Sequence, residues 1–330
     1  MKKLLPPLFV LSLLSLSSCG DKKDVAIVTQ KYVHKYGYAV SKAEWDAKNY
    51  PGQVVTTLRD GVTIVASYEN GQLNGPTTQT FPQSQTIESY KLYNKGVLTK
   101  EVQYNSRGLP KMETVFMAPA AKTITLWFES GSPLSIEEYS SGSLIEGQYF
   151  TPSNETESRV VKGKGVRSLR DAEGILTAKE QFENSSVTKR ETFFTNGVPE
   201  SITFYQDGKL TGERHVYNAS GEPEVVEHYQ NGLLSGLATY FKNGCKFVEV
   251  SYKDGEKHGD EIHFIDGKMI SQRISWQDGF KHGASSFFVD GTAHTHWFHK
   301  GNRVGQNRFD ELCEMDERMQ SLLEQNKTTY

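Results

Sequence analysis

Hydrophobic and polar residues alternate along most of this chain, in short stretches separated by turn residues. Val248, Val250 and Tyr252 share one parity, and Ile262 and Phe264 share another. A period of two is typical of strands with one buried face. The stretches repeat every 11 to 12 residues, which is too short for a helix of several turns with glycine at both ends. The pattern therefore predicts one β-strand in each stretch.

Glycines mark the turns between these strands at a regular interval. Two interleaved series recur with a period of about 23 residues, and each glycine of the first series is followed four residues later by another glycine. The first series includes Gly208, Gly232, Gly255, Gly279 and Gly301, and the second includes Gly197, Gly221, Gly244, Gly267 and Gly291. Most follow Asn or Asp, and such pairs are strong hairpin signals because both residues accept positive φ. A repeat of this length predicts stacked hairpins rather than a compact enzyme domain.

An aromatic residue stands three positions before many of these glycines. The clearest examples are Tyr205, Tyr229, Phe241, Tyr252, Phe264, Trp276, Phe288 and Phe298. A two-residue loop would place the two aromatic series on opposite faces of the sheet, whereas a longer loop would place them together. The second glycine favours the longer loop. We therefore expect one shared aromatic face that lines a groove, and these eight residues are the candidate binding and stacking surface.

The expected fold is all-β, an elongated antiparallel array of β-hairpins with about 20 strands over residues 60–305. Residues 25–59 do not follow the repeat. Ser41 and Glu44 form a capping-box pattern that predicts a short helix ending near Lys48. We expect residues 25–59 to cap the first strand of the array; the alternative is a small recognition element.

Residues 306–330 change to a helical pattern followed by a tail. Phe309, Leu312, Met319 and Leu323 have helical spacing, with charged residues between them. The exposed edge of a long sheet invites pairing with other chains. We therefore expect a capping α-helix over the last strand; the alternative is an amphipathic helix that binds a partner or a second copy.

The segments Tyr252–Gly259 and Trp276–Gly283 each carry an aromatic residue, a turn glycine and a second glycine. This arrangement resembles the variant MORN repeat, and bacterial proteins with such arrays are grouped as YwqK-like and labelled antitoxins. The resemblance covers about three quarters of the chain. It implies a MORN-like hairpin array that acts as an interaction or scaffold surface, and it makes an antitoxin the alternative function.

Residues 1–18 have the pattern of a lipoprotein signal peptide. Lys2 and Lys3 precede a short apolar stretch that is too short for a permanent membrane span. The sequence before Cys19 resembles a lipobox, so Cys19 is the expected site of lipid attachment, as in palmitate-bearing lipoproteins, and residues 19–24 form a lipidated tether. Gly20 follows Cys19, which resembles an outer-membrane destination in the envelope of bacteria with two membranes.

Removal of Lys2 and Lys3 changes the formal net charge from −3 to −5. This mildly acidic balance excludes a broad basic surface for nucleic acid.

No catalytic motif is present in the sequence, and no metal or cofactor is expected. His294 and His296 share a strand face but His299 does not, which favours surface histidines over a metal site. Lys162 to Arg170 is interpreted as a basic strand rather than an anion site. Cys245 and Cys313 are expected to be buried free thiols, since a bridge would join residues too far apart.

These observations favour a non-enzymatic, membrane-anchored lipoprotein whose repeat surface binds an envelope protein or peptide. An immunity partner of a toxin is the first alternative, and a glycan-modifying enzyme on the concave face is the second. The second alternative requires an acidic cluster in the groove. The sequence leaves the ligand and the oligomeric state open.

Overall fold

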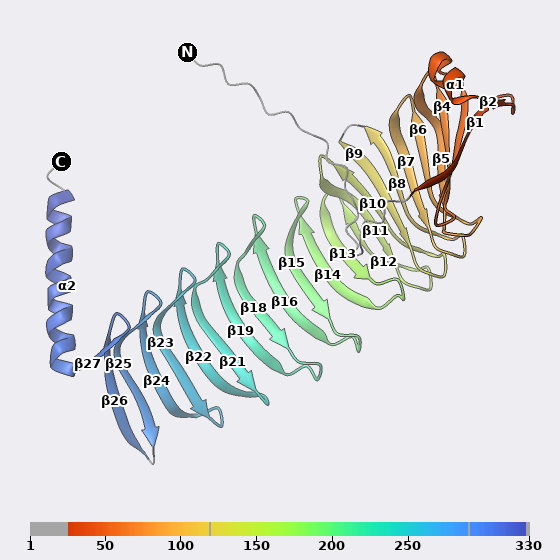
Figure 1. Ribbon diagram of the computed structural model, residues 1–330. Coiled ribbons are helices and arrows are strands. Elements are labelled where there is room, and N and C mark those ends of the chain that lie inside the picture. The colour runs from red at the N-terminus through yellow and green to blue at the C-terminus, as the bar shows by residue number, and fades with distance from the viewer. Residues whose placement is uncertain (1–25, 119, 290, 328–330) are drawn as a thin grey trace. The chain divides into compact units, whose positions relative to one another are not determined.

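The computed structural model describes residues 26–118, 120–289 and 291–327. Two units divide the chain, one ending at Val97 and the other beginning at Leu98. Across the described residues there are 27 strands and two helices, and paired strands are antiparallel (Figure 1). The all-β hairpin fold predicted from the sequence is confirmed. Cys19, the signal peptide and the tether lie outside the described residues.

The N-terminal unit is a small antiparallel sheet with strand order β2-β1-β3-β4-β5-β6. Its elements are β1 (Ile27–His34), β2 (Ala39–Val40), α1 (Lys42–Lys48), β3 (Gly52–Leu58), β4 (Thr63–Glu69), β5 (Gln72–Thr80) and β6 (Ile87–Asn94). The capping box is confirmed, because Ser41 and Glu44 bond reciprocally at the start of α1. Trp45 of α1 is buried and packs its ring 5.5 Å from Tyr32 and 6.1 Å from Tyr68. These contacts fix the helix to the sheet.

The C-terminal unit is one antiparallel meander in which each strand pairs with its neighbours in the sequence. Its first strands are β7 (Val97–Tyr104), β8 (Pro110–Ala118), β9 (Ala121–Trp127), β10 (Pro133–Ser140), β11 (Ser143–Phe150), β12 (Thr156–Val161), β13 (Lys164–Arg170), β14 (Leu176–Glu183) and β15 (Ser186–Phe193). The remaining elements are β16 (Pro199–Gln206), β17 (Lys209–Leu210), β18 (Gly212–Tyr217), β19 (Pro223–Gln230), β20 (Leu233–Leu234), β21 (Gly236–Lys242), β22 (Cys245–Lys253), β23 (Glu256–Ile265), β24 (Met269–Gln277), β25 (Phe280–Val289), β26 (Thr292–His299), β27 (Asn302–Val304) and α2 (Gln306–Lys327). Both β17 and β18 pair with β16, so together they occupy the place of one strand in the meander. The strands β20 and β21 pair with β19 in the same way.

Two-residue turns connect the strands along one edge of this unit. Lys253 pairs with Glu256, which leaves only Asp254 and Gly255 in the loop. Their φ angles are 53° and 88°. A type I′ turn requires positive φ at both positions, which is why Asn or Asp precedes the glycine so often.

Three-residue turns connect several strands along the other edge. Asn218 donates its backbone N–H to the Glu222 carbonyl at 2.9 Å, and Gly221 donates to the Asn218 carbonyl at 2.9 Å. Farther along the chain, the turn at this edge that contains Asn243 and Gly244 has only two residues.

Second glycines of the repeat such as Gly259 and Gly283 lie in bulges within their strands rather than in loops. Gly259 has a φ of 95°, and the pairing of β22 with β23 shifts register beside it. It lies directly opposite Trp276 of the next strand, and Gly236 likewise lies opposite Tyr252. A Cβ added at Gly259 would lie 3.1 Å from the Ser251 Cβ. The glycine therefore bends its strand and leaves room for the ring of its neighbour.

The two aromatic series lie on opposite faces, so the expectation of one shared aromatic face is wrong. Tyr240 pairs with Val248 and shares the face of Tyr252, whereas the adjacent Phe241 points to the other side. By the same alternation, one face carries Tyr205, Tyr229, Tyr252, Trp276 and Phe298, and the other carries Phe241, Phe264 and Phe288. The physical reason is that the loops are short and the extra glycine belongs to a bulge.

We call the face with Tyr205 and Tyr229 the inner face, because its side chains are the more buried. Ala238 on this face is 0% exposed, whereas its neighbour Leu237 on the outer face is 42% exposed. Thr203 and Phe204 show the same contrast, at 8% and 37%. The strands are bowed (Figure 1), and α2 packs at the β25–β26 end of the sheet. Burial of the inner face therefore comes from the curvature and side chains of the sheet itself.

Candidate functional site

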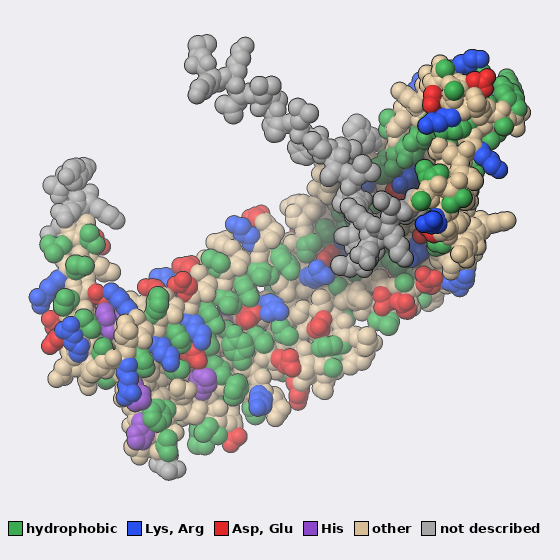
Figure 2. Space-filling view, viewed as in Figure 1, with side chains coloured by type: hydrophobic (Ala, Val, Ile, Leu, Met, Phe, Trp, Pro, Cys, Tyr) green, Lys and Arg blue, Asp and Glu red, His purple; other side chains and the backbone are tan. Residues whose placement is uncertain are grey.

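A line of side chains runs across the middle of the strands on the inner face. Its positions lie two residues before the inner aromatic or, on the intervening strands, directly opposite such a position. From β10 to β23 it includes Glu137, Arg167, Glu180, Arg190, Thr203, Arg214, Glu227, Ala238, Val250 and Glu261. We call these residues the inner ladder. Figure 2 shows acidic, basic and hydrophobic side chains interspersed over the visible surface of the C-terminal unit.

Glu137 is the most fully bonded charge in the inner ladder and is only 3% exposed. Its Oε2 accepts hydrogen bonds from the Tyr139 hydroxyl at 2.8 Å and from Arg167 Nη2 at 3.2 Å. Its Oε1 accepts from the Tyr149 hydroxyl at 3.0 Å and from Arg167 Nε at 2.8 Å. Four donors satisfy this carboxylate, which is what a buried charge requires.

The charges continue into the next two strands. Arg167 Nη1 lies 3.5 Å from Glu180 Oε2, and Arg190 Nη1 lies 3.6 Å from Glu180 Oε1. Glu180 therefore contacts a base on each of its two neighbouring strands. Opposite charges alternate across these strands, so neighbouring side chains attract one another. Like charges at the same positions would repel.

The protonation states of the groups around Glu137 favour a static hydrogen-bond network. Burial, together with the hydrogen bond and charge of Glu137, raises the pKa of Tyr139 to about 12. Burial and the charge of Glu137 also raise the pKa of Tyr149 far above its usual range. Burial lowers the pKa of Arg167, but the opposing charge of Glu137 outweighs it and the pKa is raised. Both hydroxyls therefore remain neutral donors near pH 7, and neither is poised to act as a base or a nucleophile.

The same arrangement recurs farther along the sheet. Glu227 Oε2 accepts from Arg214 Nη1 at 2.8 Å and from the Tyr229 hydroxyl at 3.1 Å. Burial and the charge of Glu227 raise the pKa of Tyr229. The recurrence of an acid, a base and a hydroxyl indicates one repeated structural motif.

Glu261 is held by a different pair of donors in β23. It forms an ion pair with Lys257 and a hydrogen bond at 2.7 Å with His263 Nε2. Burial raises the pKa of Glu261, but the bonds from Lys257 and His263 outweigh it and lower the pKa overall. The Lys257 Nζ also lies 4.7 Å from the centre of the Trp276 ring, within cation–π range.

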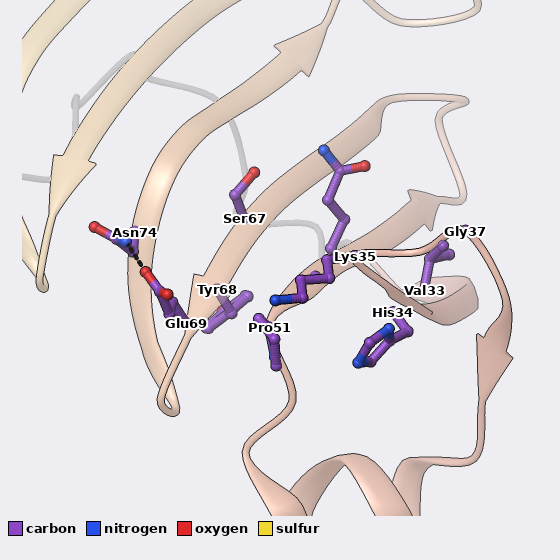
Figure 3. A pocket seen from close by; sticks show the side chains of 11 residues that line it. Val33, His34, Lys35, Gly37, Pro51, Ser67, Tyr68, Glu69 and Asn74 are labelled. Carbon is purple, nitrogen blue, oxygen red and sulfur yellow. Dashed lines mark hydrogen bonds between the residues drawn. The ribbon is translucent and has the colours of Figure 1, made fainter.

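A cavity of about 420 Å³ lies in the N-terminal unit. Figure 3 shows its lining, with Glu69 and Asn74 hydrogen bonded to each other on one side and His34 on another. The His34 ring stacks 4.5 Å from the Tyr38 ring and accepts a bond at Nδ1 from the Tyr36 backbone at 3.3 Å. This wall is aromatic and polar, and it belongs to the segment expected either to cap the array or to recognise a ligand.

Helix α2 packs on the end of the C-terminal unit, as the predicted cap requires. Phe309 lies 5.1 Å from the rings of both Trp297 and His282, and Asp316 Oδ2 lies 3.0 Å from His299 Nε2. The last turns of the helix point their apolar residues outward. Met319 and Leu323 are 64% and 61% exposed, so their expected place against the last strand is wrong.

The other residues singled out in the sequence form no metal centre. His294 and His296 share a face, and both contact the Phe287 ring at 5.1 and 5.6 Å. His299 instead faces α2. Across residues 26–118, 120–289 and 291–327, no group of three or more His, Cys, Asp and Glu side chains has metal-binding geometry.

The basic strand between Lys162 and Arg170 is paired with acids. Arg170 forms two hydrogen bonds with Glu157 at 2.8 and 2.9 Å, and Arg167 contacts Glu137. These pairs occupy the groups that an anion site would need.

The two thiols are free, and Cys313 is half-buried with its Sγ 3.8 Å from His282 Nε2. Cys245 is exposed. The expected burial of Cys245 is therefore wrong, because its place at the start of β22 lies beside a turn rather than in the middle of a strand.

Sequence reasoning missed the inner ladder, although a signal for it exists. Glutamate stands two residues before tyrosine at Glu137 and again at Glu227. Arginine stands two residues after the second glycine at Arg167 and Arg214. Following these positions through the repeat would have revealed an alternating line of charge.

Comparisons with known proteins leave the family open. The chain matches no protein-family model and no curated protein. Among solved structures it matches a mutant Tc holotoxin pore of Photorhabdus luminescens, with 11% identity and a TM-score of 0.17. That match covers 81% of this chain and 15% of the other, and at such a TM-score it supports no conclusion about fold or function. Within the described residues, no helix has the length and hydropathy needed to span a bilayer.

Proposed function

We propose that this protein is a non-enzymatic lipoprotein of the bacterial envelope, anchored through Cys19, whose inner face binds a protein or peptide. The observation that supports this most directly is the inner ladder. It offers charged and aromatic groups on strand after strand, in an arrangement already satisfied by hydrogen bonds at Glu137 and Glu227. A surface built in this way suits recognition spread over several repeats.

The chemistry of the face favours binding over catalysis. Arg167 lies between Glu137 and Glu180 along the inner ladder. Arg190 and Arg214 lie between Glu180 and Glu227, and each of these three carboxylates is engaged with a base. Glycoside hydrolysis uses two carboxyl groups that face one bond across a short gap. Alternating ion pairs of this kind offer complementary charge to a partner instead.

A site-specific photocrosslinker in intact cells tests the scaffold. Phe287 on the inner face and Phe288 on the outer face are adjacent and similarly exposed, at 36% and 39%. We expect a crosslinker at Phe287 to capture a reproducible envelope neighbour and one at Phe288 to capture much less. Equal capture from both positions, or none from either, contradicts the proposal. If the captured neighbour is a toxin that co-expression neutralises, the immunity-partner alternative replaces it.

The lipid anchor is tested separately. Cells fed an alkyne-tagged palmitate should label the wild-type chain, and Cys19→Ser should abolish labelling and release the protein from the membrane fraction. Cys245→Ser is the matched control, because it makes the same change at an exposed thiol outside the signal segment. Labelling that persists in Cys19→Ser would show that the anchor lies elsewhere.

A further inference from the structure

The inner ladder has an uncharged position that lies between two arginines. Glu180 lies opposite Arg190, and Arg214 lies opposite Glu227. Between these two pairs, β16 presents Thr203. Thr203 lies opposite Arg190 on one side, and the register of β16 with β18 places Arg214 beside it on the other. Two arginines thus flank a position that has no acid.

The repeat itself shows which group is missing. In β19, Glu227 accepts a hydrogen bond from the hydroxyl of Tyr229, two residues farther along the strand. Glu137 is held in the same way in β10. In β16 the tyrosine is retained as Tyr205, but Thr203 replaces the glutamate. The strand therefore keeps the donors that hold a carboxylate elsewhere in the sheet and lacks the carboxylate.

These donors are available. Arg190 Nη1 lies 3.6 Å from Glu180 Oε1, which is a long contact, and the Arg190 side chain is 46% exposed. Arg214 uses Nη1 for Glu227, and its side chain is 36% exposed, so further N–H groups of both guanidinium groups remain. Thr203, which lies between the two arginines, is 8% exposed and brings no charge to them. Guanidinium N–H groups that are not used within the sheet can bind an acceptor that another molecule supplies.

We propose that Arg190, Thr203, Tyr205 and Arg214 bind a carboxylate supplied by another molecule, an Asp or Glu side chain of an extended acidic peptide. This carboxylate takes the place that Glu227 occupies in β19. The inference deepens the proposed scaffold function and rests on it. An arginine fork on each side matches the two oxygens of a carboxylate, and the open inner face allows a peptide to approach.

A variant that supplies the missing group tests the site directly. Thr203→Glu places a carboxylate between the two arginines, so it should raise the melting temperature and abolish peptide binding. The control Thr195→Glu makes the same change at an exposed loop position and should alter neither property. The probe is a capped peptide with a single central glutamate, and its glutamine counterpart is the reference, both followed by fluorescence anisotropy on the full chain in detergent.

We expect the glutamate peptide to bind at least tenfold more tightly than the glutamine peptide, and added salt to weaken it. Arg190→Gln should remove about tenfold of that affinity while the protein remains folded. This second variant keeps the test decisive if Thr203→Glu fails to fold. Equal affinity for the two peptides, or unchanged binding in both variants, overturns the site.

A phosphorylated peptide distinguishes the chemistry of the bound group. Tighter binding of a phosphoserine peptide than of the glutamate peptide overturns the assignment to a carboxylate. The result is separable from that of the scaffold: if crosslinking at Phe287 captures a partner but acidic peptides do not bind, the scaffold stands and the carboxylate site falls.

Discussion

Removal of the Glu137 carboxylate is the sharpest test of how the C-terminal unit is held together. Glu137→Ala deletes four hydrogen bonds at once and leaves Arg167 and two tyrosine hydroxyls without their main acceptor. Loss of one partner of a buried ion pair costs about 3–5 kcal/mol. Arg167 is 26% exposed and retains Glu180 at 3.5 Å, so we expect the lower end, about 3 kcal/mol.

The matched control lies one residue away. Glu138 is exposed on the opposite face of the same strand, so Glu138→Ala should change the free energy of unfolding by less than about 0.5 kcal/mol. Urea unfolding followed by circular dichroism measures both variants. The double variant Glu137→Ala with Arg167→Met should recover part of the loss, because it removes the uncompensated charge. Equal stability of the two single variants would refute the view that this network stabilises the sheet.

Three further outcomes are expected. Because the pKa of Tyr139 is raised from 10.0 to about 12, the folded state retains its proton longer than the unfolded state; stability should therefore be fully present below pH 10 and fall towards pH 12, and Tyr139→Phe should reduce that fall in alkaline unfolding curves. Gly259→Ala should cost about 1–3 kcal/mol in thermal unfolding because its φ is 95°, whereas Gly305→Ala, which meets no atom within 4 Å and affects only the start of α2, should cost less than about 1 kcal/mol; similar losses would argue against the bulge. Phe309→Ala should make α2 sensitive to limited proteolysis with little change in the melting of the sheet, and Met319→Ala should not; a stable helix in both variants would show that Phe309 does not anchor it.

The strands and turns could be predicted because their determinants are local. Asp254 and Gly255 specify a type I′ turn by their own backbone preferences, and the alternation around Val250 specifies a strand. Ser41 and Glu44 specify the start of α1 in the same manner. The face on which each aromatic lies could not be predicted in this way, because a glycine such as Gly259 is equally suited to a loop and to a bulge. Only the pairing with the next strand, where Trp276 lies opposite it, decides between the two.

The inner ladder escaped prediction for a different reason. Residues such as Glu137 and Glu180 are polar, and polar residues in an alternating strand normally indicate the exposed face. Here they lie on the buried face and are tolerated because a base from another strand reaches each of them. That compensation depends on cross-strand contacts of up to 30 positions in sequence, which a reading of one strand does not include.

Each bulged glycine lies opposite an aromatic residue of the next strand, so this contact joins only adjacent strands. This arrangement limits how the number of strands in the sheet can change. Insertion or deletion of a whole hairpin preserves strand direction, so Gly236 and Tyr252 would still meet, as would their counterparts. Gain or loss of a single strand would reverse the direction of every later strand, so each later loop would lie at the opposite edge of the sheet. Evolution can therefore lengthen or shorten the sheet of the C-terminal unit only in steps of two strands, so the number of its repeats changes by whole hairpins.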